Sequence, residues 1–191
     1  MPGRQAKFIT PAMLRRMLQR VRHSKNPARD RVIILLSAKA GLRAAEIAQL
    51  DWSMVLTANG KIGDVIALHD AIAKKRSGRL IPLHPALKRT LHHLQRKAQP
   101  VGPIIRSARG GAMRPNSVVN WFVALFAELG LEGCSSHSGR RTFITGAARN
   151  VHRAGCSLRD VQLLAGHRSI EMTQRYIDGD TSGQRRLVAL L

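Results

Sequence analysis

The sequence predicts an α+β fold, mainly helical, in which a single domain of 191 residues carries one small antiparallel sheet. Apolar residues recur at helical spacing over most of the chain. Only two short neighbouring runs are rich in branched residues, as strands are. The length fits one domain, or at most two small ones, and 44% hydrophobic residues are enough to bury a core.

The first part of the chain reads as three helices. Thr10-Pro11 places an N-cap and a first-turn proline before a helix that runs to Val21. Asn26-Pro27 repeats this signal before a second helix, for which Gly41 is the expected C-cap. A third, short helix is expected from Arg43 to Leu50.

A β-hairpin is expected next. Val65 to Leu68 and Leu80 to Leu83 form its two strands, and the basic stretch AKKRSG lies between them. After it, Gln99 to Asn116 contains three prolines and three glycines and is expected to be a loop inside the domain.

The remaining segments show helical spacing again. The Ser157-Leu-Arg-Asp160 pattern of a capping box marks one helix start. The helices are expected at Leu87 to Leu94, Val118 to Leu129, His137 to Ala148, Ser157 to Leu164 and Ser169 to Ile177.

The charge indicates a polyanionic partner. The chain has 32 Lys and Arg against 11 Asp and Glu, a formal net charge of +21. Arginines make up 24 of the 32, and arginine is the better fork for phosphate. Nucleic acid is the expected partner, against the alternative of a solvated basic surface encoded by a GC-rich genome. Only seven aromatic residues, without a stacking motif, disfavour an RNA-binding module.

Several function classes are disfavoured. Neither a membrane-spanning run nor a signal-peptide core is present, so a cytoplasmic protein without membrane contact is expected. Cys134 and Cys156 form no CxxC pair that could begin a zinc ribbon, and no metal-binding His/Cys set or phosphate-binding glycine loop occurs. No metal ion or cofactor is expected.

Four separate segments carry a pattern together. They are GLRAAEIAQLDW at residues 41–52, the hairpin with Lys74, HSGRRTFIT at residues 137–145, and LLAGHRSIEMTQRY at residues 163–176. In order and spacing they resemble the catalytic domain of the tyrosine recombinases, the family of phage integrases, Cre-like and Xer-like recombinases and fimbrial-switch invertases. The resemblance covers the chain from about Phe8 to its end.

The resemblance implies a site-specific recombinase that cleaves and rejoins duplex DNA through a 3′-phosphotyrosyl intermediate. It assigns the catalytic roles to Arg43, Lys74, His137, Arg140, His167 and Tyr176. It also implies a homo-oligomer, a tetramer on DNA, and a cytoplasmic, nucleoid-associated location.

The residue types fit this chemistry without the family. Attack on a phosphodiester adds negative charge to the non-bridging oxygens, which the guanidinium forks of Arg43 and Arg140 can bind. His137 lies three residues before Arg140, which places both on one helix face. Tyr176, the only tyrosine, supplies a hydroxyl nucleophile. A lysine on the hairpin can protonate the leaving 5′-oxygen, with Lys74 preferred by its spacing and Lys75 left open.

Two departures from the family pattern carry expectations. Gly139 stands where the family usually has leucine, which predicts a looser helix start. The family's separate N-terminal DNA-binding domain is expected to be absent, which predicts weak DNA binding alone and a need for partner protomers or an accessory DNA-binding protein.

Purely structural roles for the single residues, and other functions for the chain, stay open. Each arginine taken singly could be a surface ion-pair residue, each histidine a packed or capping one, and Tyr176 an edge-of-core residue. Glu46 is expected to orient Arg43 by i, i+3 pairing. A type IB topoisomerase or telomere resolvase shares the same chemistry. A non-catalytic DNA-binding regulator should lack a phosphate ligand or the tyrosine, and none is missing.

Overall fold

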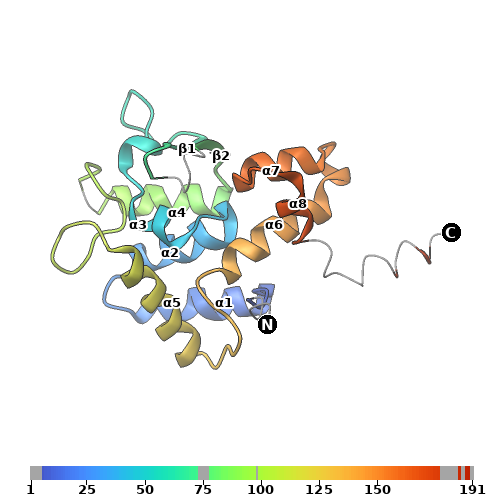
Figure 1. Ribbon diagram of the computed structural model, residues 1–191. Coiled ribbons are helices and arrows are strands. Elements are labelled where there is room, and N and C mark those ends of the chain that lie inside the picture. Colours follow the sequence, from blue (N-terminus) through green and yellow to red (C-terminus); the bar gives the residue numbers. More distant parts are fainter. Residues whose placement is uncertain (1–5, 73–77, 98, 177–184, 186–187, 190–191) are drawn as a thin grey trace. The chain divides into compact units, whose positions relative to one another are not determined.

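A computed structural model describes residues 6–72, 78–97, 99–176, 185 and 188–189. Its elements in chain order (Figure 1) are α1 Pro11–Arg20, the 3-10 helix η1 Val21–His23, α2 Pro27–Ala40, α3 Ala44–Ala48, η2 Trp52–Met54, β1 Val65–Leu68, β2 Arg79–Pro82, α4 Pro85–Gln95, α5 Pro115–Glu128, α6 Ser138–Asn150, η3 His152–Ala154, α7 Leu158–Ala165 and α8 Ile170–Gln174. The predicted α+β class, mainly helical with one two-stranded antiparallel sheet, is confirmed.

The chain forms two compact units, residues 1–143 and residues 144–191. Helix α6 belongs to both, because the division falls between Phe143 and Ile144. The expectation of one catalytic domain over residues 1–191 stays a prediction. Within the described residues, no helix combines the length and the apolar character that crossing a bilayer requires.

Helix α2 is the centre of the first unit. Val32 to Leu36 are all buried, so the helix is apolar on every side, which is the pattern of a helix surrounded by others. It packs against α4, and α3 packs against α5 (Figure 1). The predicted end signal is confirmed, since Gly41 closes α2 in the left-handed conformation with φ 66°. At α1, the Thr10 hydroxyl accepts the Met13 N–H as expected.

The segments after α2 agree in type with the sequence prediction but differ in length. Helix α3 starts at Ala44 and ends at Ala48, so Arg43 is its N-cap residue and not part of it. Strand β2 lies one residue earlier than expected, and its Arg79 pairs with Leu68 of β1 in the antiparallel register. The expected loop after α4 ends at Arg114, because Pro115 starts α5.

The second unit confirms its predicted start signal. The Ser157 N–H donates to Asp160 Oδ2 at 2.8 Å, as in the expected capping box. Gly166 then ends α7 in the left-handed conformation with φ 62°. Helix α8 is shorter than expected, because it ends at Gln174 and leaves Tyr176 beyond its last turn; Ile177 lies outside the described residues.

Gly139 lies in the first turn of α6, the segment that the sequence predicts to be looser. Gly139 is buried against α2, and a Cβ placed on it would lie 2.2 Å from Ser37 Oγ and 2.9 Å from Ser37 Cβ. The glycine therefore allows a close approach of two helices. Among the described residues, the buried Ser37 hydroxyl has no hydrogen-bond partner.

Gly139→Ala should therefore destabilise the protein, although alanine normally favours a helix. We expect a loss of about 1–3 kcal/mol in the free energy of unfolding, measured with urea, because the added methyl group overpacks the contact. Ser37→Ala removes the nearest clashing atom and an unsatisfied hydroxyl, so it should be neutral or stabilising alone and should reduce the cost of Gly139→Ala. Wild-type stability of Gly139→Ala would contradict the close approach.

Candidate active site

Arg43 is held at the start of α3 by Glu46. Its backbone N–H donates to Glu46 Oε2 at 2.8 Å, and its guanidinium Nη1 donates to Glu46 Oε1 at 2.8 Å. This confirms the expected i, i+3 pair. The Arg43 side chain is 20% exposed, whereas that of Glu46 is only 1% exposed. The pair therefore presents the guanidinium toward solvent from a buried carboxylate.

Arg79 is a second partner of the same carboxylate, and the sequence interpretation missed it. Its Nη1 and Nη2 donate to Glu46 Oε1 and Oε2, each at 3.1 Å. The Arg79 side chain is 6% exposed, so the fork lies inside the protein. The sequence contains a signal that Arg79 is buried, because strand alternation places it on the same face as buried Ile81.

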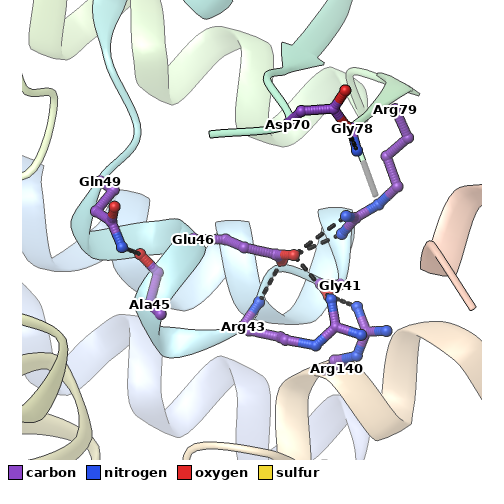
Figure 2. A network of polar contacts seen from close by, with 9 residues as sticks. All are labelled: Gly41, Arg43, Ala45, Glu46, Gln49, Asp70, Gly78, Arg79 and Arg140. Carbon is purple, nitrogen blue, oxygen red and sulfur yellow. Dashed lines mark hydrogen bonds and ion pairs between the residues drawn. The ribbon is translucent and has the colours of Figure 1, made fainter. Parts of the chain in front are cut away.

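Arg140 lies in the first turn of α6 and is 3% exposed. Its Nη1 donates to the carbonyl oxygen of Gly41 at 2.7 Å. Because Gly41 is only two residues before Arg43, one turn of the chain positions both predicted arginines. Figure 2 shows Arg43, Arg79 and Arg140 converging on Glu46 and this turn. The first unit thus brings together the two expected phosphate ligands.

His137 precedes α6 instead of lying within it. Its backbone N–H donates to Ser135 Oγ at 3.3 Å, and its carbonyl accepts the Arg141 N–H at 2.9 Å. The residue is exposed, whereas Arg140 three residues later is buried. His137 is therefore an exposed residue that directly precedes the buried first turn of α6.

Lys74 and Lys75 lie outside the described residues. The residues on both sides of that segment are described, and the Gly78 N–H donates to Asp70 Oδ1 at 2.7 Å (Figure 2). The hairpin predicted to carry the lysine is present, with β1 and β2 antiparallel.

The second unit brings His167 and Tyr176 together. Their rings stack with centroids 5.3 Å apart and an interplanar angle of 24°. His167 is buried between α7 and α8, and its Nδ1 lies 3.0 Å from Thr173 Oγ1. The Tyr176 carbonyl accepts a bond from Thr145 Oγ1 at 3.0 Å. Thr173 thus contacts the His167 ring, and Thr145 contacts the backbone of residue 176; the sequence interpretation included neither contact.

Glu46 is a titratable group of the site whose pKa departs from its ordinary value. Burial alone raises the pKa of its carboxyl group and is the largest single influence. The hydrogen bonds and charges of Arg79 and Arg43 together outweigh burial, so the pKa lies below its ordinary value of 4.5. Glu46 is therefore a carboxylate at neutral pH and cannot act there as an acid.

This shift predicts how stability depends on pH. In the unfolded chain the Glu46 carboxylate is protonated near the ordinary pKa of glutamate, whereas in the folded protein it is protonated only at lower pH. The stabilisation is thus complete above pH 4.5 and is lost as the pH falls through the lowered value. In Glu46→Gln, we expect the free energy of unfolding at pH 7 to drop by about 3–5 kcal/mol, because one partner of a buried ion pair is lost.

Urea unfolding between pH 3 and 7 measures how the contribution of Glu46 to the free energy of unfolding depends on pH. The difference in the free energy of unfolding between wild type and Glu46→Gln should shrink as the pH falls below the ordinary glutamate pKa of 4.5. Glu128→Gln is the matched control, because Glu128 pairs with Arg20 at an exposed position and should contribute less than about 1 kcal/mol. A difference that stays constant over this pH range would contradict the ionised, paired state of Glu46.

Within the described residues, no group of three or more His, Cys, Asp or Glu side chains is arranged to hold a metal ion.

Comparison with known proteins decides the family. A family model described as the phage integrase family matches residues 7–182, which is most of the chain. The chain belongs to the phage integrase family. The resemblance found in its motifs is thereby confirmed, and the motifs of this integrase-family chain fall inside the matched range.

Named relatives of the chain are tyrosine recombinases, in agreement with the family model. The tyrosine recombinase XerC of Rhizobium meliloti (strain 1021) is 29% identical over 160 residues, which cover 81% of this chain and 47% of that protein. XerC of Brucella suis biovar 1 (strain 1330) is 30% identical over 165 residues, with 81% and 47% covered. The integrase-family chain therefore spans about half the length of the curated relatives it matches.

Solved structures show the same fold. The crystal structure of XerA recombinase superposes with a TM-score of 0.76 at 18% identity, covering 99% of this chain and 66% of the other. The Tn1549 transposon integrase in complex with transposon right-end DNA gives 0.71 at 19% identity, with 94% and 64% covered. XerH bound to its palindromic difH substrate, in a post-cleavage complex, gives 0.74 at 18% identity, with 99% and 54% covered.

Proposed function

We propose that this chain is the catalytic part of a site-specific recombinase that cleaves and rejoins duplex DNA through a covalent bond between Tyr176 and a 3′-phosphate. The observation that carries the proposal is the stacking of the only tyrosine on His167, in a chain of the phage integrase family. The names of the XerC relatives, and the DNA held by the Tn1549 and XerH proteins, support duplex DNA as the substrate.

The arginines of the first unit are proposed to bind the scissile phosphate. Attack on phosphorus produces a five-coordinate species with additional charge on its non-bridging oxygens, and planar guanidinium groups match those oxygens. Arg43 and Arg140 supply two such groups, each with a fixed partner in the protein. His137, which is exposed directly before α6, is proposed as a further donor to the same phosphate.

The second unit is proposed to supply the nucleophile. The Tyr176 hydroxyl attacks phosphorus, loses its proton and displaces the 5′-oxygen of the next nucleotide, which leaves a phosphotyrosyl ester and a DNA hydroxyl. His167 is proposed as an additional hydrogen-bond donor to the phosphate, with its ring orientation set by Thr173. The ester conserves the energy of the broken bond, so a DNA hydroxyl can reverse the step without ATP.

Lys74 is proposed to protonate the leaving 5′-oxygen. An alkoxide leaves poorly, and a lysine beside it can supply the proton. Replacing the bridging 5′-oxygen by sulfur produces a leaving group that needs no proton. We expect such DNA to restore cleavage by Lys74→Ala but not by Arg43→Ala, whose defect concerns the non-bridging oxygens. Normal cleavage by Lys74→Ala together with a sulfur-rescued defect in Lys75→Ala would transfer the role to Lys75.

The proposed partners follow from the charge and the relatives. A net charge of +21 suits a polyanion such as double-stranded DNA. We further propose assembly as a homo-oligomer, a tetramer on paired sites, with an accessory DNA-binding protein where this chain alone binds weakly. Its place of action would be the nucleoid in the cytoplasm.

The test captures covalent complexes from sheared genomic DNA of the encoding organism, so that no target sequence must be known. The protein is incubated with the DNA in EDTA, denatured with detergent and recovered, and the attached 3′-ends are sequenced. We expect adducts to form in EDTA, because the arginines take the place of a divalent ion. The adducts should lie at a small set of sites related by inverted repeats. Adduct formation that needs magnesium would contradict the proposed chemistry, and dispersed attachment sites would favour a topoisomerase.

A further inference from the structure

Glu46 connects two arginines through both of its oxygens. Oε1 accepts from Arg43 Nη1 at 2.8 Å and from Arg79 Nη1 at 3.1 Å. Oε2 accepts from the Arg43 backbone N–H at 2.8 Å and from Arg79 Nη2 at 3.1 Å. The bidentate fork of Arg79 therefore sets the plane of the carboxylate, and the carboxylate in turn sets Arg43 (Figure 2).

The two arginines differ in access. The side chain of Arg43 is 20% exposed, and that of Arg79 is 6% exposed. Arg79 is therefore badly placed to bind a DNA phosphate, whereas Arg43 can reach one. Arg79 also comes from a different element, the strand β2 that follows the predicted lysine segment.

Charge gives Arg79 a second effect. Arg43 and Glu46 alone would form a neutral pair, in which the carboxylate competes with a phosphate for the guanidinium. With Arg79 the cluster has two positive charges and one negative charge, so a net positive charge remains for the phosphate. This matters most where the groups are shielded from water, because charges act more strongly there.

We propose that Arg79 is a positioning residue that acts through Glu46 to fix the Arg43 guanidinium and to keep its charge available for the phosphate. The consequence for cleavage rests on the proposed function, in which Arg43 binds the scissile phosphate. The positioning itself can be measured without DNA.

The first experiment measures hydrogen exchange of the Arg43 backbone amide by NMR. Arg79→Ala frees the carboxylate, so we expect this amide to exchange about tenfold faster, equivalent to about 1.4 kcal/mol of lost protection. Arg79→Lys keeps the charge but loses the fork, so a smaller increase is expected. The chain has four glutamates, Glu46, Glu128, Glu132 and Glu171, so the ¹³C-carboxyl signal that disappears in Glu46→Gln is assigned to Glu46 and should shift in both Arg79 variants.

The matched control is Lys88→Ala, which removes a positive charge from the exposed pair with Asp64, just before β1. It should change neither the Arg43 amide nor the Glu46 signal. Unchanged Arg43 exchange in folded Arg79→Ala, or in Arg79→Lys where the alanine variant does not fold, would overturn the inference.

The second experiment is a double-mutant cycle on the rate of adduct formation. We expect Arg79→Ala to reduce the rate of adduct formation about tenfold to a hundredfold, because a small displacement of the Arg43 guanidinium from the phosphate slows the reaction. The affinity for DNA should be nearly unchanged. Since Arg79 acts through Glu46, adding Arg79→Ala to Glu46→Gln should reduce the rate little further. Fully additive losses would overturn the proposal. Absence of any adduct from wild type would contradict the proposed function, while the exchange measurement still decides the role of Arg79.

Discussion

Tyr176→Phe is expected to abolish the covalent protein–DNA adduct while the fold and the DNA affinity stay close to those of the wild type. The change removes one oxygen atom, the proposed nucleophile. A phenylalanine ring can keep the stacking on His167, and the bond from Thr145 goes to the backbone carbonyl of residue 176, which is unaffected. Detergent-resistant adducts are counted on the DNA sites found with wild type.

The uniqueness of this tyrosine sharpens the measurement. Because the chain has one tyrosine, phosphotyrosine released by hydrolysis of the wild-type adduct identifies Tyr176 directly. Thermal unfolding and a DNA-binding titration of Tyr176→Phe provide the controls. An adduct formed by Tyr176→Phe, or phosphoserine in the wild-type hydrolysate, would rule out this residue as the nucleophile.

Arg140→Lys is expected to reduce the cleavage rate by about 10²–10³, as is typical when a donor to a developing oxyanion is lost. Lysine keeps the charge but cannot hold the Gly41 carbonyl and a phosphate oxygen at once in one plane. Arg43→Lys is expected to show a loss of the same order, because it breaks the bond from the guanidinium to Glu46. Single-turnover cleavage at saturating DNA separates this loss from weaker binding.

Arg141→Lys is the matched control for Arg140→Lys. Arg141 is the next residue of the same helix and also donates to a backbone carbonyl, that of Ala6, while its guanidinium lies 4.2 Å from the centre of the Phe8 ring. We expect it to affect stability but not the rate of cleavage by folded protein. Equal losses in both variants would mean that Arg140 acts only by holding α6 in place.

Local signals explain why much of the fold could be predicted. The Thr10 cap, the Gly41 stop and the capping box at Ser157 depend on neighbours within a few residues, and each was confirmed. Element ends were less predictable. Helix α8 ends at Gln174, before the expected Ile177, and the Tyr176 carbonyl beyond its end accepts a bond from Thr145, which is distant in sequence.

The sequence by itself determined the fold class, the family motifs and the pairing of Arg43 with Glu46, because periodicity, order of motifs and i, i+3 spacing are properties of neighbouring residues. The tertiary structure decided what surrounds them. It brought Arg79 to Glu46 across 33 residues and Arg140 to the Gly41 carbonyl across 99, and it set Gly139 against Ser37. Such contacts depend on how helices and strands pack in space. Spacing along the chain can indicate that a residue such as Arg79 is buried, but it does not identify its partner.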